Sequence, residues 1–293
     1  MKNFFSAILF YFVLLPLSWL PYSVIYFISN GIAFVLENVV SYRKDVIMSN
    51  LRASFPEKSE KEIAQIAKAF YQHLSDVLFE TLKSLSWSKE DAQARVKYEN
   101  LEDINRFFNE GKDVLLLLGH FGNWEWFGPS FPMAVPHKAI GIYKPLSNTF
   151  FDEKIKQTRG KYGLELVPMK DTNDRMKEQG AKPKMAMFLT DQSPSNPNRC
   201  YWTTFLNQET GVQFGAEKFA KVYDMPLVYM SISKPKRGFY IIKFKTLFEN
   251  PQETEVGEIT VAHTLALETD IIKNPELWLW SHKRWKHKKP VSL

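Results

Sequence analysis

The sequence predicts an α/β fold, with a mostly parallel sheet flanked by helices, behind an N-terminal helical segment that anchors the chain to a membrane. Two observations support this prediction. From residue 96 onward, short apolar runs alternate with amphipathic stretches, and strands that alternate with helices form parallel sheets covered on both faces. Before that region, residues 3–36 contain no charged side chain, and about 20 apolar residues are enough to span a bilayer.

The uncharged N-terminal segment is too long for the apolar core of a signal peptide. It has room for one tilted helix with an interfacial segment, or for a short helical hairpin, and Pro16 and Pro21 mark a break within it. Arg43 and Lys44 follow it, and positive residues tend to stay on the cytoplasmic side. We therefore expect a membrane anchor over residues 1–42 and one cytoplasmic domain over residues 43–293. The alternative is a buried helix pair in a soluble protein.

The composition indicates anionic and apolar partners. The net charge of +6 suits phospholipid head groups, phosphorylated substrates, acidic carrier proteins or nucleic acid. Aromatic residues make up 15% of the chain, which favours a membrane interface or an apolar ligand. The sequence has no zinc-module spacing and no aromatic RNA-binding motif, so we expect no nucleic-acid partner. The single cysteine, Cys200, excludes an internal disulfide and is typical of a reducing compartment.

The chain between residues 46 and 85 has a helical pattern. Ser59 and Glu62 have the spacing of a capping box, which predicts the start of a long amphipathic helix. His73 and Asp76 lie in this helix three positions apart, and we interpret them as a surface pair rather than as a site.

The following region alternates between predicted strands and helices. Strands are expected at residues 96–98, 114–118, 139–143, 164–168, 184–189 and 227–232, and helices at residues 101–109, 149–162, 216–223 and 256–272. Residues 240–244 alternate in polarity and are expected to pair antiparallel with the preceding strand.

Polar residues follow three of these strands directly. His120, Lys144 and Asp191 each lie just beyond the carboxyl end of a strand, and such ends share the edge at which open α/β sheets bind ligands. Asn123, Asn148 and Arg159 are near them in sequence. His120 is suited to act as a general base near neutral pH, and Glu125 is a carboxylate that can fix its tautomer. The alternative is a strand-end histidine that only hydrogen-bonds to the backbone.

The segment from His120 to Glu125, His-Phe-Gly-Asn-Trp-Glu, resembles the HxxxxD/E motif of glycerolipid-type acyltransferases. In particular, it is similar to the form found in the bacterial lipid A late (secondary) acyltransferases. Three further blocks match that family in the same order, namely Tyr143 to Asn148 with the downstream Arg159, Thr190-Asp191-Gln192, and the tryptophan-rich segment from Asn274 to Lys286.

The resemblance implies a glycerolipid acyltransferase-like fold and transfer of a fatty acyl group from acyl carrier protein to a hydroxyl of a lipid acceptor at the bacterial inner membrane. On this basis His120 is the base and Glu125 its orienting partner, with no covalent enzyme intermediate. No metal and no cofactor other than the acyl carrier protein co-substrate is expected. Lys144 and Arg159 are cations for an anionic head group or the oxyanion. Asn123, Asn148, Asp191 and Gln192 are candidate positioning residues for the substrate.

The C-terminal segment allows two compatible interpretations. Trp278, Trp280 and Trp285 are expected to pack under the sheet. The basic residues around them are expected to face anionic phospholipid or the acidic carrier protein; they are Lys283, Arg284, Lys286, His287, Lys288 and Lys289.

One departure from the family pattern leaves the acceptor open. A Phe-Gly pair expected soon after the Asp-Gln block is replaced here by Phe205-Leu206-Asn207. An aminolipid or lysophospholipid acceptor is therefore an alternative to a lipid A precursor. A membrane-anchored lipid-binding protein without activity is a third possibility. A metal hydrolase is disfavoured because His120 and Glu125 stand alone within their segment.

Overall fold

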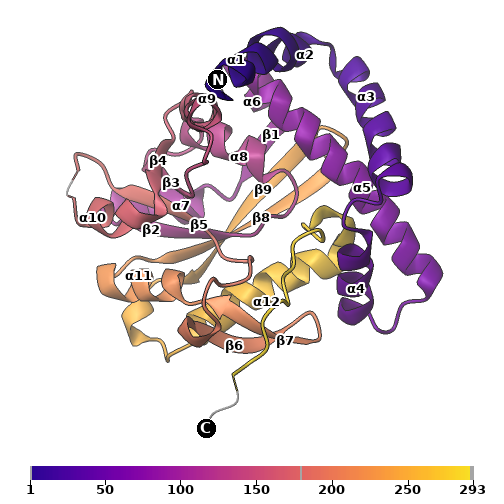
Figure 1. Cartoon of the computed structure of the whole chain (residues 1–293). Helices are drawn as coiled ribbons and strands as arrows, with labels where there is room; N and C mark the ends of the chain where they lie inside the picture. The colour runs from indigo at the N-terminus through magenta and orange to yellow at the C-terminus, as the bar shows by residue number, and fades with distance from the viewer. Residues whose placement is uncertain (1, 179, 291–293) are drawn as a thin grey trace.

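The computed structural model describes residues 2–178 and 180–290. A seven-stranded sheet with the order β1-β9-β8-β2-β5-β3-β4 lies between two layers of helices (Figure 1). Its strands are β1 (Val96–Glu99), β2 (Val114–Leu118), β3 (Lys138–Tyr143), β4 (Glu165–Pro168), β5 (Lys184–Leu189), β8 (Leu227–Lys236) and β9 (Phe239–Phe248). All neighbouring strands pair in parallel except β8 and β9, which pair antiparallel as predicted. The predicted fold class is confirmed.

The central strand β2 explains why the sheet is covered on both sides. All five of its residues are apolar and fully buried, which requires apolar neighbours above and below the sheet. Alternate residues of a strand point to opposite faces. Leu116 pairs with Met187 and points to one face, whereas Leu117 pairs with Phe188 and points to the other.

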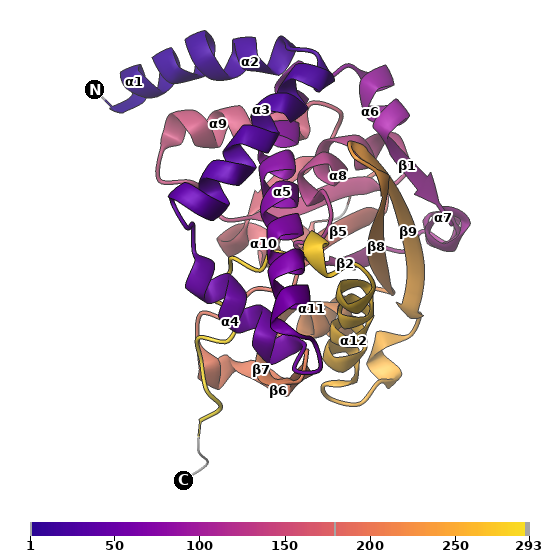
Figure 2. The ribbon, with the colours of Figure 1, turned by 90° about the vertical axis from the view of Figure 1, so that its right-hand side faces the viewer.

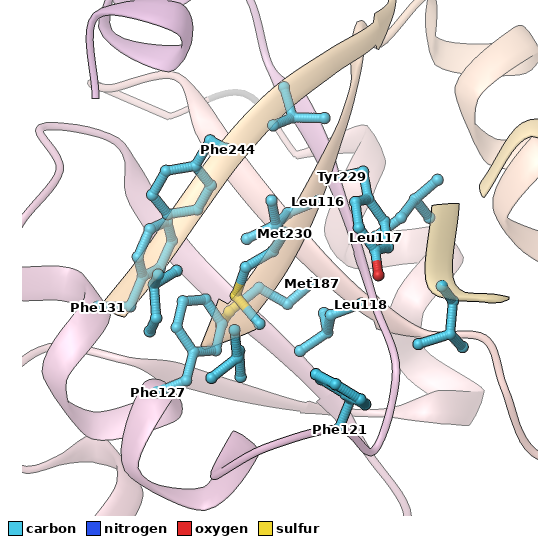
Figure 3. Close-up of a cluster of buried hydrophobic side chains, with 14 of the residues drawn as sticks. Leu116, Leu117, Leu118, Phe121, Phe127, Phe131, Met187, Tyr229, Met230 and Phe244 are labelled. Atoms are coloured by element: carbon cyan, nitrogen blue, oxygen red, sulfur yellow. The ribbon is translucent and has the colours of Figure 1, made fainter. Parts of the chain in front are cut away.

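The first face, here the α8 face, lies under α8 (Trp124–Ser130). Figure 3 shows Phe127 of this helix, and Phe131 just after its end, packed against Leu116, Met187 and Met230. The second face, here the α11 face, lies under α11 (Gly215–Tyr223) and α12 (Glu258–Lys273). Phe188 contacts Phe219 of α11 with ring centroids 5.5 Å apart.

The remaining helices and the small second sheet connect these layers. The helices are α4 (Lys44–Ser54), α5 (Glu60–Lys83), α6 (Lys89–Arg95), α7 (Glu102–Asn109), α9 (Thr149–Gly160) and α10 (Thr172–Lys177). Strands β6 (Cys200–Phe205) and β7 (Gln208–Gln213) form an antiparallel hairpin that the sequence did not predict. The predicted capping box at Ser59 and Glu62 is present.

The interpretation of His73 and Asp76 as a surface pair is wrong. Both side chains are buried, because this side of α5 faces the loop after His120 and the turn between β8 and β9. His73 Nε2 lies 3.1 Å from the carbonyl oxygen of Gly122. The carboxylate of Asp76 accepts hydrogen bonds from Arg237 and from Ser29, which compensates for its burial.

The N-terminal segment forms two helical stretches separated at Pro21 (Figure 2). The first consists of α1 (Lys2–Leu9), a π-helical turn (Phe10–Leu14) and α2 (Leu15–Trp19), and the second of α3 (Tyr22–Phe34) and another π-helical turn (Val35–Val39). Within the described part of the chain, one helix, Tyr22–Val39, is long and apolar enough to cross a membrane.

One side of this N-terminal helix is bound to the folded domain. Tyr26 donates to Glu80 of α5 at 2.8 Å, and Ser29 donates to Asp76 at 2.7 Å. Its other side exposes large apolar side chains, including Phe27 and Phe34. The helix therefore has a polar side directed at α5 and an apolar side without a protein partner among the described residues.

Candidate active site

The three strand-end residues singled out in the sequence lie on adjacent strands. His120 follows β2, Asp191 follows β5 and Lys144 follows β3, and the order in the sheet is β2-β5-β3. A cavity of about 660 Å³ opens at this edge. Its polar lining includes His120, Glu125, Lys144, Arg159 and Gln192. Apart from these residues, its walls are largely apolar, which is typical of a site for a lipid or another small molecule.

His120 is fixed by Asp191 through its backbone and its ring. The backbone N–H of His120 donates to Asp191 Oδ2 at 2.8 Å, and its Nδ1 lies 2.7 Å from Asp191 Oδ1. With Nδ1–H donated to the carboxylate, Nε2 is the basic atom of the ring. Nε2 lies 3.2 Å from the amide nitrogen of Gln192, which also lines the cavity.

The electrostatics of this pair favour a charged imidazole. Burial disfavours the imidazolium, but the neighbouring Asp191 carboxylate outweighs it, so the pKa of His120 is raised above 6.5. Burial acts against ionisation of Asp191 as well, yet His120 and a hydrogen bond from Trp278 lower the pKa of this carboxyl to about 2. Asp191 is therefore a buried carboxylate, with a side chain only 2% exposed, that stabilises positive charge on His120.

The structure differs from the sequence prediction in the partner of His120. Glu125 was expected to orient the imidazole, but its carboxylate binds the guanidinium of Arg159 at 2.7 and 3.1 Å in a bidentate pair. Glu125 lies in the first turn of α8 and Arg159 in the last turn of α9, and both line the cavity. Glu125 and Arg159 therefore form a fixed ion pair beside the imidazole, and Glu125 does not accept a hydrogen bond from His120.

Strand register explains why Asp191 takes this position. Leu118 pairs with Leu189 at the ends of β2 and β5, and His120 and Asp191 each lie two residues further along the chain. The backbone N–H of Thr190 also donates to the carbonyl of Leu118, which continues the ladder towards the site. The two side chains therefore leave adjacent strands side by side.

Asn123 and Asn148 do not line the cavity, although the sequence suggested that they contact the substrate. Both are N-caps. Asn123 Oδ1 accepts the N–H of Trp126, while its Nδ2 donates to Glu80 at 2.6 Å. Asn148 Oδ1 accepts the N–H of Phe151, and its Nδ2 donates to Ser6 of the N-terminal segment. Each amide fixes a loop that carries cavity residues.

A buried carboxylate behind the motif was not recognised in the sequence. Glu80 of α5 is fully buried and accepts hydrogen bonds from Asn123, Tyr240 and Tyr26. Burial raises its pKa to about 7. An acidic residue on the apolar side of the long helix was the only signal in the sequence that could have indicated it.

The C-terminal segment supports the same pair from behind. Trp278 and Trp280 are buried as expected, and the indole Nε1 of Trp278 donates to Asp191 Oδ2 at 2.9 Å. The carbonyl of Leu277 accepts the N–H of Gly122, which attaches this segment to the loop after His120. The tryptophan-rich block therefore holds both members of the His120–Asp191 pair in place.

The expected basic patch requires one correction. Arg284 is 3% exposed, because its guanidinium lies under the β6–β7 hairpin near the ring of Phe205. His287 is half-buried and contacts the carbonyl of Pro194. Four lysines of the patch are exposed, namely Lys283, Lys286, Lys288 and Lys289.

No three His, Cys, Asp or Glu side chains gather within residues 2–178 and 180–290 in a set that could hold a metal ion. Cys200 is partly buried, its Sγ contacts the carbonyl of Pro197, and burial raises the pKa of its thiol. The site therefore consists of the His120–Asp191 pair, the Glu125–Arg159 pair, and the exposed Lys144 around an apolar cavity.

Comparison with known proteins confirms the resemblance. Residues 2–287 match the family described as "Bacterial lipid A biosynthesis acyltransferase". The chain is 23% identical to the "Lipid A biosynthesis lauroyltransferase" of Escherichia coli (strain K12), over 91% of this chain and 87% of that protein. It is 22% identical to the "Lipid A biosynthesis palmitoleoyltransferase" of the same organism, and 21% identical to the "Lipid A biosynthesis acyltransferase" of Haemophilus influenzae, with 91% and 86% covered in each case. This protein therefore belongs to the bacterial lipid A biosynthesis acyltransferase family, and it is an enzyme of that class.

Proposed function

We propose that the protein transfers a fatty acyl group from acyl carrier protein to a hydroxyl of a lipid A-type acceptor, with His120 as general base and without a covalent enzyme intermediate. The observation that carries this proposal is the His120–Asp191 pair, whose imidazole lines a largely apolar cavity. A base whose Nε2 faces an apolar cavity is suited to activate a hydroxyl beside a hydrocarbon chain.

The reaction follows from the tautomer that Asp191 selects. Nε2 of His120 accepts the proton of the acceptor hydroxyl while its oxygen attacks the thioester carbonyl. The tetrahedral intermediate then collapses, the carbon–sulfur bond breaks, and the leaving thiolate recovers the proton from the imidazolium. Asp191 stabilises the imidazolium between these two steps, as its effect on the pKa of His120 indicates.

The cations around the cavity have separate roles in this proposal. Arg159 is already neutralised by Glu125, so it positions that carboxylate and supplies N–H donors near the reacting carbonyl. Lys144 is exposed at the cavity edge and is suited to bind an anionic head group.

The surface supports attachment to the cytoplasmic face of the bacterial inner membrane. The N-terminal segment exposes large apolar side chains that are suited to enter a lipid surface, namely Phe4, Phe5, Phe12, Trp19, Phe27 and Phe34. In this proposal residues 1–42 attach the enzyme to the membrane and residues 43–293 form its catalytic domain. The exposed C-terminal lysines are available to acidic carrier protein or anionic lipid.

A lipid A-type acceptor is preferred to an aminolipid or lysophospholipid for two reasons. The relatives described above are acyltransferases of lipid A biosynthesis. In addition, Leu206 and Asn207, where the sequence departs from the family pattern, form the turn between β6 and β7 and do not line the cavity. A binding protein without activity is disfavoured because a complete base and its carboxylate are in place.

Purified protein supplied with acyl carrier protein thioesters and a lipid A precursor tests the proposal. Wild-type enzyme should add one acyl chain to the precursor, and His120→Ala should lose this activity while still unfolding in one cooperative thermal transition. Gln208→Ala, in the hairpin and away from the cavity, serves as a control that should keep full activity. Transfer by His120→Ala at the wild-type rate would reject the assignment of the base.

A further inference from the structure

The cavity beside His120 has walls on both faces of the sheet. Gly141 of β3 pairs with Met187 of β5, and these residues line the cavity from the α8 face. Ile142 and Phe188, one position further along each strand, also line it, and they point to the α11 face because successive residues alternate. One cavity therefore reaches around the carboxyl ends of β3 and β5.

The arm on the α8 face, here the α8 arm, is walled by Gly128, Gly141, Leu164, Leu166 and Met187. The side chain of Leu164 lies where a Cβ added at either Gly128 or Gly141 would meet it, at 3.6 and 3.5 Å. These contacts place α8, β3 and the residue just before β4 around one narrow apolar space. Leu164 and Met187 are buried, so part of the wall of this arm lies within the protein core.

The arm on the α11 face, here the α11 arm, is walled by Ile142, Phe188, Ala216 and Phe219. The ring contact between Phe188 and Phe219 shows that β5 and α11 meet along this wall. His120 and Gln192, at the strand ends, line the part of the cavity between the two arms.

The two arms face different parts of the molecular surface. Beside the α8 arm, α9 contacts the N-terminal segment through the rings of Phe150 and Phe10, 5.7 Å apart. The α11 arm is on the opposite side of the sheet, near the end of the β6–β7 hairpin, where Gln213 also lines the cavity. The C-terminal segment passes next to the cavity residue Gln192, since His282 Nε2 accepts the N–H of Ser193 and His287 contacts the carbonyl of Pro194. Lys283 and Lys286 are exposed beside these contacts.

We propose that the two arms hold two different hydrocarbon chains, the α8 arm a chain of the lipid acceptor and the α11 arm the acyl chain of the donor. This inference rests on the proposed function, in which both substrates carry hydrocarbon. A lipid that leaves the membrane reaches His120 from the side of the apolar N-terminal segment. An acyl chain on an acidic carrier arrives from the side of the exposed lysines. The acceptor hydroxyl and the thioester carbonyl then meet where the two arms join, beside Nε2 of His120.

Matched substitutions that fill one arm at a time test the assignment. Gly128→Leu narrows the α8 arm, and it replaces a helical glycine with a better helix former. It should raise the KM for the acceptor and leave the preference among acyl donors of different length unchanged. Ala216→Leu fills the α11 arm and should disfavour the longer of two competing donors by roughly 10-fold or more.

Phe219→Ala provides a second variant for the α11 arm, should the larger side chain at Ala216 prevent folding. It enlarges the arm and should shift the preference towards longer donors. The assignment is overturned if Gly128→Leu alters the donor preference, or if both α11-arm variants leave it unchanged.

A labelling experiment separates failure of this inference from failure of the proposed function, because it needs no turnover. An acyl pantetheine thioester with a diazirine at the end of its chain is bound to the wild-type enzyme and photolysed. Cross-links mapped by mass spectrometry should lie in α11, at residues 215–223, or at Phe188. Cross-links in α8 at residues 124–130 would place the donor chain in the wrong arm and overturn the inference.

Discussion

Asp191 contacts His120 at two points, with Oδ2 accepting the backbone N–H at 2.8 Å and Oδ1 lying 2.7 Å from the ring Nδ1. The backbone contact fixes where the histidine leaves β2, and the ring contact fixes which nitrogen faces the cavity. The indole N–H of Trp278 donates to the same carboxylate at 2.9 Å. The C-terminal segment therefore positions Asp191, which in turn positions His120.

Replacing Asp191 with asparagine should leave the fold intact and remove most of the activity. The amide nitrogen of asparagine donates to Nδ1 and therefore selects the tautomer whose Nε2 carries the proton. We expect kcat to fall on the order of 10²- to 10⁴-fold. Asn123→Asp serves as a comparison, because Asn123 lies outside the cavity and its amide donates to the buried Glu80. It should lower the thermal unfolding midpoint more than Asp191→Asn does. Wild-type kcat in Asp191→Asn would contradict the role given to this carboxylate.

The pH profile of kcat/KM should have an acidic limb set by His120. The neutral imidazole is the active base, and the neighbouring carboxylate raises its pKa above 6.5 against the effect of burial. Activity should therefore fall as the pH drops through this raised pKa. Trp278→Phe removes one of the hydrogen bonds that lower the pKa of Asp191 and should move the limb to still higher pH. A limb that stays at the same pH in Asp191→Asn would show that another group titrates.

Glu80 should make the stability of the protein depend on pH between 4.5 and about 7. Burial raises the folded-state pKa of this carboxyl to about 7, so the folded protein favours the neutral form. The contribution of Glu80 to the free energy of unfolding is fully present below pH 4.5, the pKa of this carboxyl in the unfolded chain. It is lost as the pH rises through about 7. Denaturant unfolding of wild type and Glu80→Gln across this range measures the effect. The stability of the wild type relative to the variant should decrease with rising pH, and a constant difference would contradict the prediction.

Glu125 and Arg159 should act as one unit. Their bidentate pair leaves either partner with an unmatched charge when the other is removed, and lysine cannot reproduce the fork of the guanidinium. Glu125→Gln and Arg159→Lys should each lower kcat/KM, and the double variant should be little worse than either one. A double-mutant cycle of the wild type, the two single variants and the double variant should give a coupling energy of about 0.5–3 kcal/mol. Additive effects would mean that the two residues contribute independently.

The sequence predicted the parallel sheet and its flanking helices because apolar runs and amphipathic stretches alternate along the chain. It also brought His120, Lys144 and Asp191 to one edge, because each follows a strand and parallel strands share their carboxyl ends. The sequence did not predict which side chains form hydrogen bonds with one another. Glu125 is closer to His120 in sequence, but the register of β2 and β5, which no local pattern encodes, brings Asp191 to the imidazole instead.

Burial of polar groups was the other limit. Asp76 and Glu80 are acidic residues on an amphipathic helix, and only the contacts with Arg237, Tyr240 and Asn123 show why they are inside. Arg284 was grouped with exposed lysines for the same reason, since its neighbours in sequence are solvated and its own side chain is covered by the hairpin.

The mass of lipid A from cells shows whether this protein transfers an acyl chain and whether the transfer needs His120. Lipid A should be compared between a strain that lacks this protein and the same strain supplied with either the wild type or His120→Ala. We predict that the wild type adds the mass of one fatty acyl chain and that His120→Ala, at equal protein level, adds none. Lipid A of unchanged mass with the wild type, or an added chain with His120→Ala, would contradict the account.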